Sequence, residues 1–185
     1  MKQIFQDLKT KKIRIEDIPD SVVRDEHVLV RTHYSVISSG TEKTIIDTAS
    51  KNLLQKAQAR PDLVKQVFSK MQKDGLLSTY NSVLDRLDKP IALGYSASGE
   101  VIKVGNGISE YNIGDKVAIA GAGYANHSTI NCVPKNLVAK IPNNVSMENA
   151  AYTTIASIAM QGIRVAKPQI GEFVAVSGLG LVGLT

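Results

Sequence analysis

GEVIKVG, from Gly99 to Gly105, has the pattern of a short β-strand and is bounded by glycine at both ends. Three more strand patterns follow it: DKVAIAG (Asp115 to Gly121), ANHSTINCV (Ala125 to Val133) and LVAKIP (Leu137 to Pro142). Turns that contain Gly or Pro separate them. Several short strands at this spacing predict a small antiparallel β-barrel. We therefore expect a fold that is mainly β, with helices added to it.

Strand patterns also occupy the first 40 residues. Ile13 and Ile15 alternate with charged residues, and VLVRTHYSVI (Val28 to Ile37) predicts a half-buried strand. His33 shares its predicted face with Leu29 and Ile37, so a core or cleft-edge role is expected for it. The other face is predicted to carry Val28, Val30, Thr32, Tyr34 and Val36.

The segment from about residue 43 to 90 differs from its surroundings. Apolar residues recur at helical spacing from Leu63 to Met71, and a second helix is predicted from Ser78 to Pro90. We interpret the segment as a helical insertion between strands. It is either a structural appendage or a lid or partner surface, and the sequence leaves both interpretations open.

A different pattern begins after Asn144. Ser146 is a predicted N-cap for an Ala-rich helix, MENAAYTTIASIAMQGIRVA, which has few charges and is expected to be buried on most sides. Pro168 and Gly171 mark a turn. FVAVS (Phe173 to Ser177) is a continuous apolar run, which is typical of a buried parallel strand.

A GxGxxG motif follows that strand pattern directly. Gly178 permits a tight turn, Gly180 lets a pyrophosphate approach the backbone, and Gly183 lets the next helix lie close to the strand. The acidic residue that holds the ribose would come about 20 residues later, beyond Thr185. We therefore expect only the first strand and turn of a dinucleotide-binding Rossmann domain here. The predicted cofactor-binding residues are Gly178, Leu179, Gly180, Leu181, Val182 and Gly183.

Composition excludes several classes of function. The 185 residues carry 22 Lys+Arg and 17 Asp+Glu, and the net charge of +5 is spread along the chain. Aromatic residues make up 5%, and no basic, aromatic-rich patch suggests nucleic-acid binding. The single cysteine, Cys132, can form neither an internal disulfide nor a Cys-rich zinc site. Without an export signal or a membrane-spanning run, we expect a cytoplasmic protein.

The sequence resembles the medium-chain dehydrogenase/reductase family. The matching stretches are Gly94-Tyr95-Ser96-Ala97-Ser98-Gly99-Glu100-Val101, Val104-Gly105-Asn106-Gly107, Gly114-Asp115-Lys116-Val117, Gly123-Tyr124-Ala125 and Gly178 to Gly183. The resemblance implies a GroES-like barrel, the catalytic domain, over residues 1–165. It implies that a truncated Rossmann domain starts at residues 166–185. With its insertion, the chain looks most like bacterial bi-domain oxidoreductases.

The resemblance also places the positions at which zinc-dependent members of this family hold their catalytic metal. Those positions carry Ser39, Tyr95 and Ile155 here. Serine and tyrosine are poor zinc ligands, and isoleucine cannot bind a metal. We therefore expect no zinc and no zinc-assisted polarisation of an alcohol.

The implied function is that of the N-terminal catalytic domain of a zinc-independent oxidoreductase. It would use NAD or NADP to act on a small alcohol, carbonyl or quinone-type substrate, and the full-length parent could form a homodimer. Thr154, and with it Thr153, lies near the hinge where it could meet the nicotinamide ribose, although helix threonines more often bond to their own backbone. The predicted catalytic residues are Tyr95, Ser39, Thr41, Glu42 and Ser96.

A second interpretation stays open. A barrel with replaced ligand positions could serve as a non-catalytic binding or scaffold module of dehydrogenase ancestry. His127 is predicted to be structural or at the surface, and Cys132 to be a small core residue.

Overall fold

The computed structural model describes residues 1–7, 10, 12–42 and 90–185. The chain divides into two compact units, of which the first comprises Met1–Ile4, Ile15–Gly40 and Ala92–Thr185. The second comprises Phe5–Arg14 and Thr41–Ile91. The helices predicted within the insertion, at about 43 to 90, lie outside the described residues.

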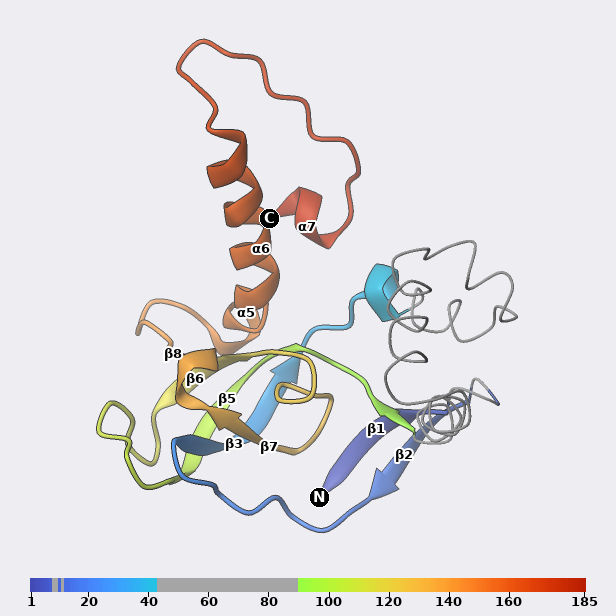
Figure 1. The fold of residues 1–185 in the computed structure, drawn as a ribbon, viewed down its shortest axis with the longest axis vertical. Coiled ribbons are helices and arrows are strands. Elements are labelled where there is room, and N and C mark those ends of the chain that lie inside the picture. Colours follow the sequence, from blue (N-terminus) through green and yellow to red (C-terminus); the bar gives the residue numbers. More distant parts are fainter. Residues whose placement is uncertain (8–9, 11, 43–89) are drawn as a thin grey trace, which may run out of the picture. The chain divides into compact units, whose positions relative to one another are not determined.

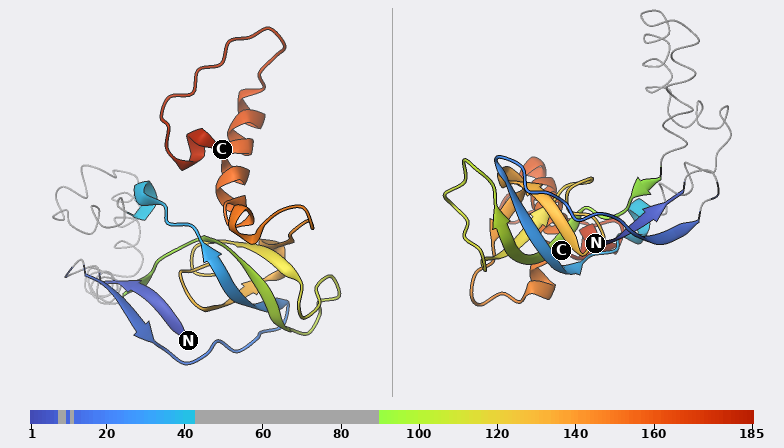
Figure 2. Two further views of the ribbon diagram at one scale, coloured as in Figure 1. Left: turned by 180° about the vertical axis from the view of Figure 1, so that it is seen from behind. Right: turned by 90° about the horizontal axis from the view of Figure 1, so that it is seen from below.

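A five-stranded antiparallel sheet forms the body of the first unit (Figure 1). Its strand order is β7-β3-β5-β6-β8, and the short helix η1 (Lys135–Leu137) joins β7 to β8. The sheet curls, as the right-hand view of Figure 2 shows, and the predicted mainly-β, barrel-like architecture is confirmed. The strands are β3 (His27–Ser35), β5 (Ser96–Val104), β6 (Lys116–Ala120), β7 (Ile130–Pro134) and β8 (Val138–Lys140).

A smaller sheet contains β1 (Lys2–Gln6), β2 (Ile13–Asp17) and β4 (Ile91–Ala92) in the order β2-β1-β4. The strand predicted from the alternation at Ile13 and Ile15 is therefore present. Both isoleucine side chains are exposed, which places them outside the core.

The hydrophobic core is formed by side chains on the inner face of the curled sheet. Consecutive residues are buried along β5 (Ser96 to Gly99) and β6 (Val117 to Ile119), because the core covers one face of these strands and helices cover part of the other. Burial of each such aliphatic side chain contributes about 2 kcal/mol to folding. The fully or almost fully buried members are Val28, Val30, Ala97, Val101, Val117, Ile119, Ala125 and Val133.

Strand β3 departs from the predicted simple alternation. Its pairing with β5 shifts register between Leu29 and Val30 and again between Thr32 and Tyr34. The second shift leaves His33 as the extra residue of a bulge, and its side chain is exposed. The expectation of a core position for His33 is therefore wrong, whereas a place at the edge of a cleft stays a prediction. Ile37 is also exposed, because the strand has ended at Ser35.

The predicted Ala-rich helix is two helices, α5 (Met147–Ala150) and α6 (Thr153–Ala166). Ser146 caps α5 as predicted, because its side chain accepts a hydrogen bond from the Asn149 amide at 3.1 Å. The expectation that the helix is buried on most sides is wrong. Only its first turns pack on the sheet, and the far part of α6 exposes its apolar residues. Within the described ranges, no helix has the length and hydropathy needed to cross a membrane.

The segment after α6 doubles back to end in the short helix α7 (Leu181–Leu184), which packs on α6 (Figures 1 and 2). Residues 173–177 form no strand, although their sequence predicted a buried one. A strand needs a neighbouring strand to satisfy its backbone groups, and no described residue pairs with this segment. Phe173, Val174 and Val176 are exposed as a result.

The close approach of β3 and β5 gives a stability prediction. A Cβ at Gly99 would collide with the backbone carbonyl oxygen of Arg31, so Gly99→Ala should lower the free energy of unfolding by about 3 kcal/mol. Gly162, inside α6, has open space around its Cβ position, so Gly162→Ala should raise it by up to about 1 kcal/mol. Urea denaturation of both variants checks the pair. If both substitutions changed the free energy of unfolding equally, the contact between Gly99 and the Arg31 carbonyl could not be tight.

Candidate functional site

An apolar cluster gathers residues from distant parts of the first unit. Its buried members are Val36, Ala151 and Ile155, and the half-buried Tyr95 and Leu181 pack against them. Val36 follows β3, Tyr95 precedes β5, Ile155 lies in α6 and Leu181 begins α7. We call these five residues the Tyr95 cluster. It joins one predicted catalytic residue to one predicted cofactor-binding residue.

Backbone hydrogen bonds hold Tyr95 in place. Its carbonyl oxygen accepts from the Gly121 amide at 2.9 Å, and the next carbonyl, that of Ser96, accepts from the Val36 amide at 3.0 Å. The Tyr95 hydroxyl has no hydrogen-bond partner among the residues that the structure describes. The phenol is thus held through its backbone and ring, and a phenolic O–H can both donate and accept a hydrogen bond.

Ser96 and Ser98 point to the same face of β5, and both donate to the helices that cover it. Ser96 Oγ donates to the Ala151 carbonyl at 2.5 Å, and Ser98 Oγ donates to the Met147 carbonyl at 2.5 Å. Both serines are almost fully buried. Their hydroxyls anchor α5 and the start of α6 to the sheet. Sequence reasoning missed Ser98, although the i, i+2 spacing of the two serines on one strand could have indicated a shared face.

The three other predicted catalytic residues lie on one helical turn, Ser39 to Glu42. Ser39 is exposed and follows the buried Val36 by a short link. Thr41 and Glu42 belong to the second compact unit, and each has an interaction of its own. Their participation in catalysis stays a prediction.

The residues at the expected metal positions do not fit a zinc ion. Ile155 has no ligand atom and is fully buried among apolar neighbours, with the Tyr95 ring packed against the same cluster. A zinc site needs converging Cys, His or carboxylate ligands. Among the described residues, no group of three or more such side chains comes together.

The glycine-rich turn has the backbone geometry that its sequence predicts. Gly178 has a φ of +103°, which L-residues rarely adopt. A Cβ at Gly183 would collide with the Gly178 carbonyl oxygen, whereas the Cβ position of Gly180 is open. Thr154 is half-buried on α6, and Thr153 donates to the Ala150 carbonyl at 2.7 Å. Binding of a cofactor by these residues stays a prediction.

Comparison with known proteins assigns the fold. Residues 63–143 match the family described as the alcohol dehydrogenase GroES-like domain. Residues 63–143, which make up less than half of the chain, are thus similar to the GroES-like domain of the medium-chain dehydrogenases/reductases. This domain holds the strands β5 and β6 and the Gly94 to Val101 stretch on which the resemblance rests.

Relatives share this GroES-like domain over part of their length. The chain is 26% identical over 121 residues to the (R,R)-butanediol dehydrogenase of Bacillus subtilis. The matched region covers 51% of this chain and 34% of that relative. The galactitol-1-phosphate dehydrogenase of Escherichia coli has a similar structure, with a TM-score of 0.69 and 16% identity over 100% of this chain and 50% of that one. The chain thus spans half of that structure and about a third of the curated relative.

A second similar structure was solved with a bound cofactor. It is the quinone oxidoreductase of Escherichia coli complexed with NADPH. It superposes with a TM-score of 0.61 and 15% identity, and the match covers 90% of this chain and 41% of that one.

His127 and Cys132 have clear places in the GroES-like domain. His127 is buried, and its Nδ1 lies 2.9 Å from Ser35 Oγ, so it is structural and not at the surface. Cys132 was expected in the core, but it is half-buried and lines a surface pocket. The prediction for Cys132 is wrong because burial alternates along β7: Asn131 and Val133 are buried, and Cys132 between them points to the other face.

The contribution of a buried serine hydrogen bond to stability can be compared with that of an exposed one. Ser96→Ala should lower the free energy of unfolding by about 1–3 kcal/mol, because the Ala151 carbonyl would lose its donor inside the domain. Ser157 also donates to a helix carbonyl, at 2.8 Å, but it is exposed. Ser157→Ala should therefore change stability by less than about 0.5 kcal/mol. Thermal denaturation checks both, and an unchanged midpoint for Ser96→Ala would contradict the anchoring role.

Proposed function

We propose that the chain is the N-terminal catalytic domain of an NAD(P)-dependent oxidoreductase that acts on an alcohol, carbonyl or quinone-type substrate without zinc. One observation carries this proposal. Tyr95, the predicted proton donor, and Leu181, in the glycine-rich turn, pack against the same three apolar residues. A hydride transfer requires a proton donor beside the nicotinamide, so this shared cluster is a suitable place for the reaction.

The proposal assigns residues 166–185 to the start of a dinucleotide-binding domain. Exposed apolar side chains from Ile170 to Leu184 lack the covering layer that a parallel sheet would supply. The turn from Gly178 to Gly183 has the close backbone contact and the open Gly180 position that suit a pyrophosphate. When bound, the nicotinamide would supply or accept the hydride.

Tyr95 would donate a hydrogen bond, and then a proton, to the substrate oxygen during reduction. Its ring is held by the cluster, and its hydroxyl has no partner among the described residues. Ser39, in the same unit as Tyr95, is the second polar candidate, and a role for Thr41 and Glu42 stays a prediction from the sequence. Ser96 is a weaker catalytic candidate than these, because its hydroxyl already donates to Ala151.

The zinc-independent chemistry rests on the donor atoms at the expected metal positions. A buried isoleucine and a packed tyrosine at two of the three positions leave too few ligands for a stable site. Polarisation of the substrate oxygen would then fall to hydrogen-bond donors, of which Tyr95 is the best placed.

The scaffold interpretation has one observation in its favour. Ser96, one of the five predicted catalytic residues, is used to hold a helix on the sheet. A binding module would keep this packing and show no turnover, so an activity measurement separates the two functions.

The test uses the chain together with the residues that follow it in its gene product. We expect NAD(P)H-dependent reduction of a carbonyl or quinone substrate that persists after treatment with a zinc chelator. Tyr95→Phe should lower kcat about 100-fold or more with little change in KM, because general acid catalysis contributes on that order. Tyr34, which is exposed at the end of β3, offers the matched control Tyr34→Phe.

Three results would contradict the proposal in different ways. Loss of activity in chelator, with stoichiometric zinc in the purified protein, would exclude the zinc-independent chemistry. Full activity of Tyr95→Phe would exclude its proton-donor role. Tight NADH binding by residues 1–185 alone would show that the cofactor site is more complete than proposed.

A further inference from the structure

A polar pocket lies in the first unit beside the start of β1 and the outer strand β7. Its volume is about 240 Å³. It is separate from the Tyr95 cluster, since the two share no residue. The lining residues that matter here are Gln3, Arg24, Tyr124, Asn126, Asn131 and Cys132.

Two buried carboxamides line this pocket with unused hydrogen-bonding capacity. Gln3 is 7% exposed, and its side chain has no hydrogen-bond partner among the described residues. Asn126 is 8% exposed, and its Oδ1 accepts from the Gly123 amide at 3.1 Å. This contact identifies the Asn126 oxygen, so its NH₂ group is the end without a partner in the described part of the chain. Neither group is a fully buried unpaired atom, so both reach the open space of the pocket, where they can donate to a ligand.

The orientation of Asn126 is held by its neighbour. Asn131 is 3% exposed and uses both ends of its side chain. Its Nδ2 donates to Thr32 Oγ1 at 2.9 Å and to the Asn126 carbonyl at 3.0 Å, and its Oδ1 accepts from the Asn126 amide at 3.2 Å. The pocket wall is therefore preorganised, because the segment that carries Asn126 is fixed from both sides.

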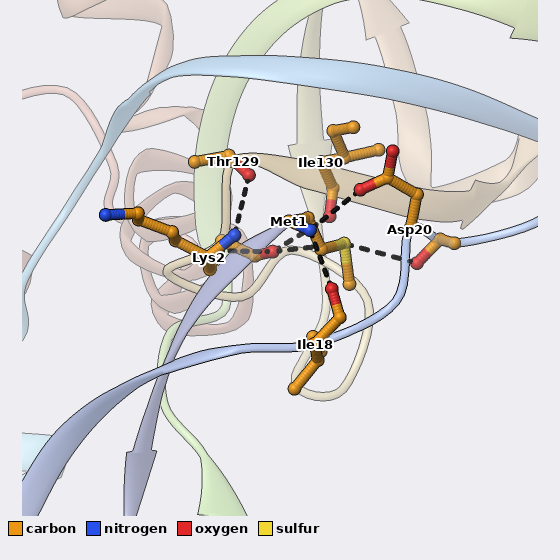
Figure 3. A network of polar contacts seen from close by, with 8 residues as sticks. Met1, Lys2, Ile18, Asp20, Thr129 and Ile130 are labelled. Carbon is orange, nitrogen blue, oxygen red and sulfur yellow. Dashed lines mark hydrogen bonds and ion pairs between the residues drawn. The ribbon is translucent and has the colours of Figure 1, made fainter.

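The charges around the pocket favour an anion. Arg24 lines it, and its guanidinium forms no ion pair within the described residues. None of the described lining residues is Asp or Glu. The nearby Asp20 carboxylate is already used, since it accepts from the Met1 ammonium at 2.7 Å, as does the Ile18 carbonyl (Figure 3).

Further hydrogen bonds hold the rim of the pocket in one conformation. The Lys2 amide donates to Thr129 Oγ1 at 3.1 Å (Figure 3), and the Lys2 carbonyl accepts from Ser128 Oγ at 3.2 Å. These contacts fasten the first residues of the chain, Gln3 among them, beside β7. The Gln3 carboxamide is thereby positioned by its backbone and not by a partner for its side chain.

We propose that this pocket binds a small carboxylate-bearing molecule. Arg24 supplies the charge and the fork-shaped pair of donors that a carboxylate accepts best. The NH₂ groups of Gln3 and Asn126 supply neutral donors from the buried wall. The volume limits the ligand to a few non-hydrogen atoms beyond the carboxylate. The proposal is independent of the redox function.

Cys132 makes the pocket directly measurable. It is the single cysteine of the chain, it is half-buried, and it lines the pocket. The rate at which a chromogenic disulfide reagent labels this thiol should fall when a ligand fills the pocket. The probe is malonate, with malonamide as the uncharged counterpart and sodium chloride at matched ionic strength. We expect malonate to slow the labelling in a saturable way and the other two to leave it unchanged.

Variants identify the groups responsible. Arg24→Gln should raise the malonate concentration for half-protection about tenfold, because a hydrogen bond to a charged group contributes on that order. Gln3→Met keeps the length of the side chain but removes its donors, so it should also weaken protection. Lys103→Gln removes an equal charge from the exposed side of β5 and should leave protection as in the parent.

The remaining outcomes overturn the proposal. Equal protection by malonamide would show that no carboxylate is recognised. An unchanged malonate concentration for half-protection in Arg24→Gln would place the anion elsewhere. Absence of protection by malonate, in a chain whose thermal unfolding is cooperative, would show that the pocket binds no small carboxylate.

Discussion

The contact between β3 and β5 supports every other feature of the first unit. β5 pairs with β3 on one side and β6 on the other, and Gly99 lets it lie directly against the Arg31 carbonyl. From the same strand, Val101 enters the core, while Ser96 and Ser98 hold the helices. Tyr95 immediately precedes this strand, so its position follows from the packing of β5. A displacement of β5 would therefore move the core, the helix anchors and the candidate catalytic residue together.

Hydrogen bonding separates the polar side chains of this domain into two groups. Ser96, Ser98 and Asn131 are buried and bonded to backbone or neighbouring side chains, so their hydrogen bonds contribute to the fold. The Tyr95 hydroxyl and the Gln3 carboxamide have no such partner among the described residues. A polar group that the fold positions but does not use is the kind of group that binds a ligand. These two residues mark the cleft of the proposed oxidoreductase and the proposed carboxylate pocket.

Local sequence patterns predicted the strands and the helix cap well. The stretches around Val101, Val117 and Val133 form strands of one antiparallel sheet, and Ser146 caps α5. The predictions that were wrong all depended on which other parts of the chain pack against the residue in question. His33 is turned outward by a bulge that depends on the register against β5. The apolar residues of α6 and of residues 173–177 are exposed because no described part of the chain covers them.

The amino-acid sequence alone determines where this domain can form tight turns and which side chains are present at each position. Glycines stand where the backbone needs φ above zero, a serine stands at the helix cap, and the three expected metal positions lack suitable ligands. Those properties are local, since each depends on one residue and its near neighbours. The meeting of Val36, Tyr95, Ile155 and Leu181 is different in kind, as is the pocket between Gln3 and Asn126. Both join residues far apart along the chain, and only the folded sheet, through its register and its helix contacts, brings them within reach of one another.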